Sequence, residues 1–108
     1  MKPRAVVLRE VAASDVEQAV DWYRREAGGA VAARFVDAIE SAFARIAHDP
    51  AAGSTRYAQE LDLRGLRTWQ VQGFPHLVFY VEAPAHVDVW RVLHEARDLP
   101  ATIGQEPA

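Results

Sequence analysis

Residues 63–94 read LRGLRTWQVQGFPHLVFYVEAPAHVDVWRVLH, three apolar runs that are rich in β-branched and aromatic residues. Such runs favour strands, and the breaks at Gly73-Phe74-Pro75 and at residues 82–85 are typical of turns. We predict strands over residues 63–71, 76–81 and 86–94. Gly65 indicates a bulge in the first of them. Because the breaks are short, neighbouring strands are expected to run in opposite directions as an antiparallel meander.

Two helical patterns precede these strands. Apolar residues recur every three or four positions from residue 16 to 27, and Ser14 and Glu17 have the spacing of a capping box, unless the helix already begins near Val11. Gly28-Gly29 is expected to end this helix, because glycine adopts C-cap conformations at no steric cost. A second apolar stripe predicts a helix over residues 30–49. The two helices would form an antiparallel hairpin.

The remaining segments complete the order of elements. Residues 4–8 predict a first strand, residues 50–60 a loop, and Asp98 the start of one C-terminal turn of helix before a frayed tail from Gly104. The order β-α-α-β-β-β indicates an α+β fold with a helical hairpin on a mostly antiparallel four-stranded sheet. We expect residues 1–108 to form a single domain with its core between about residues 4 and 103.

Both faces of the predicted sheet are apolar. Simple alternation places on one face Val78, Tyr80, Trp90 and Val92. It places on the other face Leu77, Phe79, Val87, Val89 and Leu93. Two helices cover only one face of such a sheet, so we expect a partner to cover the other face.

The composition excludes several classes of protein. The 108 residues contain no cysteine, which excludes disulfide frameworks and thiolate metal sites. The sequence contains no typical metal-ligand spacing or Gly-rich phosphate loop, so we expect neither a metal nor a cofactor. Apolar runs are too short for a signal peptide or membrane span, which predicts a cytoplasmic protein. Twelve basic and fifteen acidic residues give a net charge of −3, which disfavours direct nucleic-acid binding.

Histidine and arginine side chains are the candidates for chemistry. His94, with Glu95 and Asp98 nearby, has the makings of a general base and its orienting carboxylate; the alternative is that it ends a strand and bonds to the next loop. The candidate arginines are Arg64, Arg67, Arg91 and Arg97. They either converge on a phosphate or a partner's carboxylates, or pair with nearby acidic residues, namely Asp62, Glu95 and Asp98. Arg91 interrupts an apolar strand and therefore needs a specific partner.

A set of these residues matches a known pattern. It comprises Ala12-x-x-Asp15, Trp22-Tyr23, Ile46-x-x-x-Pro50-x-x-Gly53, Leu63-Arg64, Phe74-Pro75-His76-x-x-Phe79-Tyr80 and Val89-x-Arg91-Val92-Leu93-His94-x-x-Arg97-Asp98-Leu99. From Leu8 to Pro100 the chain resembles the ParE family, the toxins of type II toxin–antitoxin modules in the RelE/ParE superfamily. The resemblance implies the same β-α-α-β-β-β fold and a role in modules known for plasmid stabilisation.

The resemblance also implies partners. One is a small antitoxin, usually with a DNA-binding N-terminal domain, whose C-terminal segment wraps the toxin in a hetero-oligomer and would cover the open sheet face. The other is DNA gyrase, which ParE-type toxins inhibit without an established catalytic residue or cofactor.

The RelE-like branch of the superfamily instead cuts mRNA on the ribosome, and for that activity Arg91, His94 and Arg97 would be the catalytic candidates. The tail after His94 has no tyrosine and the predicted sheet has no lysine, although a scissile phosphate needs dense positive charge. We therefore expect a gyrase inhibitor; the alternatives are the nuclease and a degenerate toxin that only binds antitoxin. Residues expected to contact the target or the antitoxin are Arg64, Arg67, Tyr80, Trp90, Arg91, His94 and Arg97.

Overall fold

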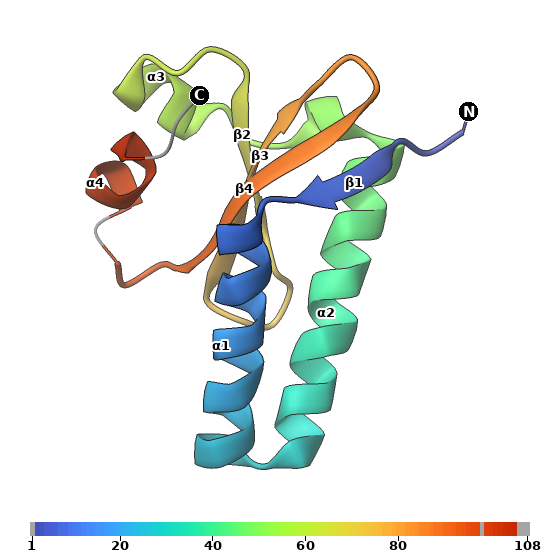
Figure 1. Cartoon of the computed structure of the whole chain (residues 1–108), viewed down its shortest axis with the longest axis vertical. Coiled ribbons are helices and arrows are strands. Elements are labelled where there is room, and N and C mark those ends of the chain that lie inside the picture. Colours follow the sequence, from blue (N-terminus) through green and yellow to red (C-terminus); the bar gives the residue numbers. More distant parts are fainter. Residues whose placement is uncertain (1, 98, 106–108) are drawn as a thin grey trace.

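The computed structural model describes residues 2–97 and 99–105. Its elements follow the predicted order, with a short helix and a 3₁₀ turn added between the hairpin and the meander (Figure 1). The elements are β1 (Ala5–Leu8), α1 (Glu10–Ala27), α2 (Gly29–His48), the 3₁₀ helix η1 (Pro50–Ala52), α3 (Arg56–Leu61), β2 (Leu66–Gln70), β3 (His76–Glu82), β4 (His86–His94) and α4 (Leu99–Gly104). The predicted α+β fold is confirmed.

The four strands form one mixed sheet in the order β1-β4-β3-β2. β2, β3 and β4 are antiparallel, and β1 runs parallel to β4 at the opposite edge from β2. The helical hairpin lies between β1 and the meander along the chain. This long connection allows β4 to lie beside β1 and run parallel to it. Gly65 was expected to form a bulge within the first strand of the meander, but it lies before β2 with φ of +86°.

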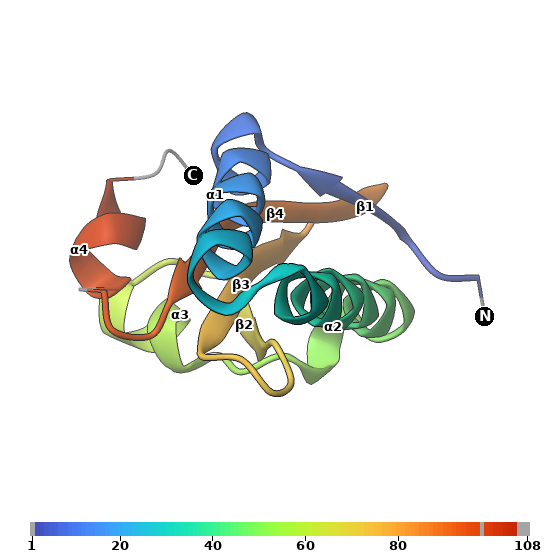
Figure 2. The ribbon, with the colours of Figure 1, turned by 90° about the horizontal axis from the view of Figure 1, so that it is seen from below.

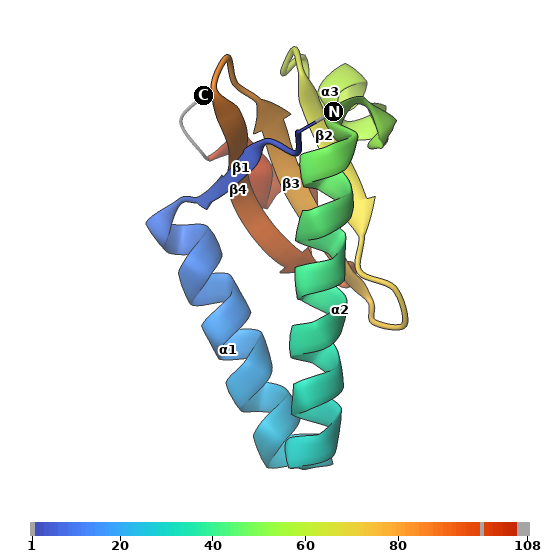
Figure 3. The same ribbon diagram turned by 90° about the vertical axis from the view of Figure 1, so that its right-hand side faces the viewer.

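The helical hairpin stands on one face of the sheet (Figure 3). The buried stripe of α2 consists of Ala32, Phe35, Ile39, Ala42 and Ile46. Between the helices Gly28 has φ of +94°, which L side chains rarely adopt, so glycine is required at this turn. The predicted capping box is wrong: α1 begins at Glu10, close to the alternative start at Val11, and the Ser14 hydroxyl accepts a hydrogen bond from Gln18 Nε2 at 3.0 Å.

The chain itself covers the second face of the sheet, which corrects the expectation of an open apolar face. α3 and α4 lie there, away from α1 and α2 (Figure 2). The core on this face consists of Tyr57, Leu66, Phe79, Trp90, Leu93, Leu99 and Ile103. The loop predicted over residues 50–60 therefore contains α3, a six-residue helix that is too short to show periodicity. The sheet faces alone give no reason to require a partner.

β4 contains one residue more than the strand opposite it. Tyr80 pairs with Val89 and Phe79 pairs with Arg91, so Trp90 is the extra residue of a bulge. A bulge shifts the alternation of side chains by one position. The buried valines of β4 consequently face the helical hairpin, whereas Trp90 faces α3 and α4. The faces predicted by simple alternation are wrong in β4 for this reason.

The predicted C-terminal turn of helix is α4, which buries Leu99 and Ile103. Asp98 and residues 106–108, the end of the tail expected to fray, lie outside the described residues. Within the described part of the chain, no helix combines the length and apolar character needed to cross a membrane.

Candidate functional site

Arg91 of β4 is held by Asp15 of α1. The Nε and Nη2 atoms of Arg91 donate to the two carboxylate oxygens of Asp15 at 2.8 and 2.9 Å, and the backbone N–H of Val92 donates to the same carboxylate at 3.0 Å. The side chains of Arg91 and Asp15 are only 12% and 10% exposed. A bidentate pair with this little solvent is directional and strong. It joins the first helix to the last strand across 76 residues of sequence.

The need of Arg91 for a specific partner is confirmed, and Asp15 was not among the acidic residues predicted for the arginines. Those residues were Asp62, Glu95 and Asp98, of which Asp98 lies outside the described residues. Asp15 lies in the motif Ala12-x-x-Asp15, for which the sequence predicted no contact with Arg91. A long-range pair of this kind leaves no periodic signal in a single sequence.

His94 ends β4, and its Nδ1 accepts a hydrogen bond from the backbone N–H of Ala96 at 2.9 Å. The structural alternative for His94 is thereby confirmed. Because Nδ1 acts as an acceptor, the ring proton of neutral His94 lies on Nε2. The bond occupies Nδ1 and is therefore incompatible with the predicted arrangement if the orienting carboxylate accepts a proton from this atom.

His76 lies opposite His94 in the sheet, with the ring centroids 5.2 Å apart. His76 is only 6% exposed, and its Nδ1 is buried without a hydrogen-bond partner among the described residues. Its ring packs against Phe35 and Tyr23 of the helical hairpin. Burial, and then the neighbouring His94, lower the pKa of His76 to about 4, so His76 is neutral at pH 7.

A small cavity of about 110 Å³ lies beside the two histidines at the end of β4. Asp15, His94 and Arg97 contribute to its lining. Arg97 is exposed, and its backbone N–H donates to the His94 carbonyl at 3.1 Å. His94 and Arg97 thus lie at one cavity together with Asp15, the partner of Arg91.

Trp90 belongs to the core under α3 and α4 and is 4% exposed. Its indole Nε1 donates to Asp88 at 3.2 Å, and the guanidinium of Arg9 lies 4.5 Å from the ring centroid while also bonding to Asp88. Trp90 therefore packs in the core on this face of the sheet.

The remaining candidates lie elsewhere. Tyr80 is fully buried, its hydroxyl donates to the Pro50 carbonyl at 2.7 Å, and burial raises its pKa. Arg67 donates from Nη1 to the Gly53 carbonyl at 2.8 Å. Arg64 is exposed before β2 and has no ion-pair or hydrogen-bond partner within residues 2–97 and 99–105. The four candidate arginines do not converge on one site.

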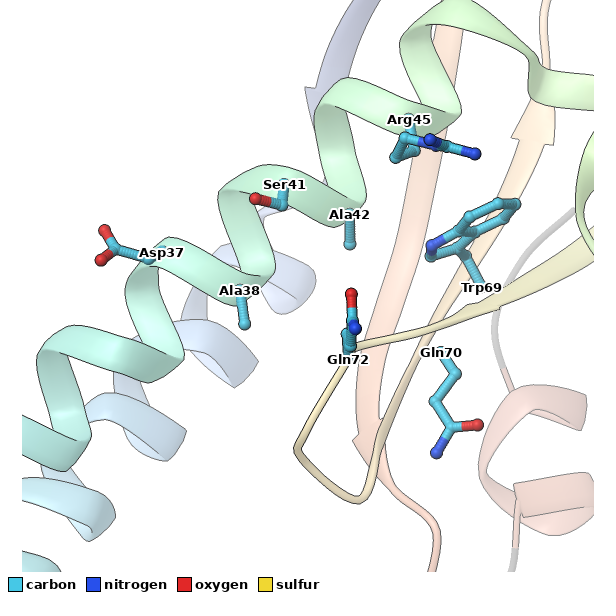
Figure 4. A pocket seen from close by; sticks show the side chains of 8 residues that line it. All are labelled: Asp37, Ala38, Ser41, Ala42, Arg45, Trp69, Gln70 and Gln72. Atoms are coloured by element: carbon cyan, nitrogen blue, oxygen red, sulfur yellow. The ribbon is translucent and has the colours of Figure 1, made fainter.

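The larger cavities lie between α2 and the edge of the sheet at β2. One of about 570 Å³ is lined by Asp37, Ala38, Ser41, Ala42, Arg45, Trp69, Gln70 and Gln72 (Figure 4). A second of about 640 Å³ shares Asp37, Ala38 and Gln72 with it and extends to Arg34 and the turn before β3. We call the two together the α2 groove. The sequence carries no signal for this groove, because its two walls, α2 and the edge of the sheet at β2, lie far apart along the chain.

Comparison with known proteins identifies the family of this chain. The model of the family described as "ParE toxin of type II toxin-antitoxin system, parDE" matches residues 6–99. The chain belongs to the ParE toxin family. Its ParE fold also matches a solved structure titled "Chromosomal ParDE TA system from P. aeruginosa", with a TM-score of 0.71 and 18% sequence identity, over 84% of this chain and 95% of that chain. No curated protein matches the sequence.

This ParE-family toxin shows no metal-binding cluster: within the described residues, no three His, Asp or Glu side chains gather closely enough to hold an ion. Several motif residues hold elements together, namely Asp15, Gly53, Tyr80 and Arg91. Two others, His94 and Arg97, are exposed and line a cavity to which Asp15 also contributes.

Proposed function

We propose that this ParE-family toxin is neutralised by a cognate antitoxin and inhibits DNA gyrase by binding to it. The family resemblance points to both partners. A protein target also agrees with the net charge of −3, which gives the surface no general attraction for nucleic acid.

The observation that carries the proposal is the Arg91–Asp15 pair. A ribosome-dependent nuclease needs a cation that is free to hold the scissile phosphate, and Arg91 occupies the strand position for it. In this chain both Nε and Nη2 of Arg91 already bond to Asp15. Moving Arg91 to a phosphate would leave the Asp15 carboxylate nearly buried without its charge partner, at a cost of several kcal/mol.

The contacts of His94 also favour inhibition by binding over mRNA cleavage. Its Nδ1 is engaged by Ala96, and no tyrosine follows it in the chain. Arg97 and His94 are exposed, but Arg97 is the only exposed arginine among the three nuclease candidates, and a single exposed arginine falls short of the charge density that phosphodiester cleavage requires. Inhibition by binding needs no such constellation.

Expression of the chain in a bacterium without the antitoxin tests the proposal. We expect filamentation and a DNA-damage response while protein synthesis continues, and we expect co-expression of the antitoxin to restore growth. Prompt loss of translation with cut mRNA would replace the proposal by the nuclease. Unchanged growth despite soluble, folded protein would indicate a degenerate toxin that only binds antitoxin.

A further inference from the structure

The α2 groove combines a cavity with an open strand edge. β2 is one of the two edge strands of the sheet. At Thr68 the N–H and C=O that point away from β3 bond to the backbone of Ser54 at 2.9 Å each. Backbone groups of every second residue in an antiparallel strand point to the same side. The N–H and C=O of Gln70 therefore point outward as well, and the Val71 N–H returns to the sheet by donating to the His76 carbonyl at 2.9 Å.

Gln70 is exposed, and its outward backbone groups have no partner in the part of the chain that the structure describes. An unpaired edge next to a cavity is a template for an added strand. Side chains of such a strand that point toward α2 would enter the 570 Å³ cavity, where Trp69 offers an apolar wall and Gln72 an amide (Figure 4).

Arginines mark the two ends of the groove. Arg34 and Arg45 are eleven residues apart on α2, which is about three turns, so they share one face of the helix some 16 Å apart along its axis. The residues between them include the small side chains Ala38, Ser41 and Ala42 that leave the space open. Neither arginine has an ion-pair partner among residues 2–97 and 99–105, although the guanidinium of Arg45 lies 5.9 Å from the Trp69 ring centroid.

We infer that the α2 groove binds an extended acidic segment of a protein partner, which pairs with the backbone of Gln70 and places carboxylates on Arg34 and Arg45. A strand rises about 3.3 Å per residue, so two carboxylates roughly five residues apart span the distance between the arginines. Among the described residues that line the groove, Arg34 and Arg45 are opposed by a single acidic side chain, Asp37, so the net positive charge of the groove favours an anionic occupant. The inference rests on the proposed function, in which the partner is the antitoxin.

Two pairs of variants test this in the complex of the full chain with its antitoxin. Q70P removes the outward N–H and leaves the bonds to β3 intact, whereas Q70A changes only the side chain. We expect Q70P to weaken the affinity about tenfold and Q70A to leave it unchanged. The double variant R34E/R45E should weaken it at least tenfold at low salt, and R25E, which reverses an exposed charge on α1, should not.

Reversing each acidic residue of the antitoxin in turn completes the test. We expect two of them, about five residues apart, to restore binding to R34E/R45E, and we expect the amide of Gln70 to exchange more slowly with deuterium in the complex. Equal affinities of Q70P and Q70A, or of R34E/R45E and R25E, with melting temperatures unchanged, overturn the inference while the antitoxin remains the partner. A wild-type chain that does not bind the antitoxin overturns the proposed function and this inference with it.

Discussion

Two sets of arginines differ in what they contact: one set bonds to residues distant in the sequence, and the other lies along α2. Arg9, Arg67 and Arg91 each bond to a carboxylate or a carbonyl that is at least 14 residues away in sequence. Arg34 and Arg45 carry the same charge on an exposed helix face beside a cavity. The contrast indicates that the first set stabilises the fold and that the second set is available to a partner. A substitution in each set should therefore change a different property.

The largest effect is expected from D15A. It removes the carboxylate that accepts three hydrogen bonds, and the nearly buried Arg91 guanidinium loses its bidentate ion pair with Asp15. We expect the free energy of unfolding to fall by about 3 to 5 kcal/mol, measured by urea denaturation. The matched control is D21A in the same helix, whose ion pair with Arg24 is mostly exposed and contributes about 0.5 kcal/mol. Equal losses for D15A and D21A would show that Arg91 does not hold the fold.

The pH dependence of stability should report the buried His76. Its pKa is about 4 in the folded chain and about 6.5 when unfolded, so between these values the unfolded chain binds more protons. The contribution of neutral His76 to the free energy of unfolding is therefore fully present above pH 6.5. It is lost as the pH drops to 4, and the loss is about 3 kcal/mol at most. We expect H76F to flatten this part of the stability curve. A curve of H76F as steep as that of the exposed control H48F would contradict the assignment.

G53A should have an intermediate effect. A Cβ at Gly53 would meet the hydroxyl of Tyr80, which is fully buried and donates to the Pro50 carbonyl. The tyrosine must shift, so we expect a loss of about 1 to 3 kcal/mol in thermal or chemical denaturation. G29A is the control, because its Cβ would lie in open space at the start of α2. Unchanged stability of G53A would mean that this segment gives way at no cost.

The smallest effect on stability is expected in the second set. R34A and R45A remove exposed charges, so each should change the free energy of unfolding by less than about 0.5 kcal/mol. The same variants should weaken antitoxin binding, which is the reverse of the pattern expected for D15A. Destabilisation of R34A or R45A by more than 1 kcal/mol would remove the distinction between the two sets.

Long periodic elements could be predicted from the sequence, and short or long-range features could not. The stripe of α2 and the apolar runs of β3 and β4 identify their elements because their periods differ. α3 has six residues and shows no period, so the cover of the second sheet face was missed. The bulge at Trp90 depends on pairing with β3, which local sequence does not encode.

The candidate site divides in the same way. The isolated charge of Arg91 in an apolar strand predicted a specific partner, and His94 and Arg97, which are three residues apart in the chain, line the same cavity. Asp15 was not recognised as that partner because it lies 76 residues away. Tyr80 and Trp90 were predicted to contact a partner, but both are buried. The exposed fraction of a strand residue depends on which helices cover its face of the sheet.

Inhibition of DNA gyrase by the purified chain is the decisive measurement for the proposed function. In a supercoiling assay we expect loss of supercoiling and accumulation of cleaved DNA, both prevented by prior addition of the antitoxin. A folded chain that leaves gyrase unaffected and instead cuts mRNA in a translating extract would contradict gyrase inhibition, because Arg91 would then have to leave Asp15 for a phosphate.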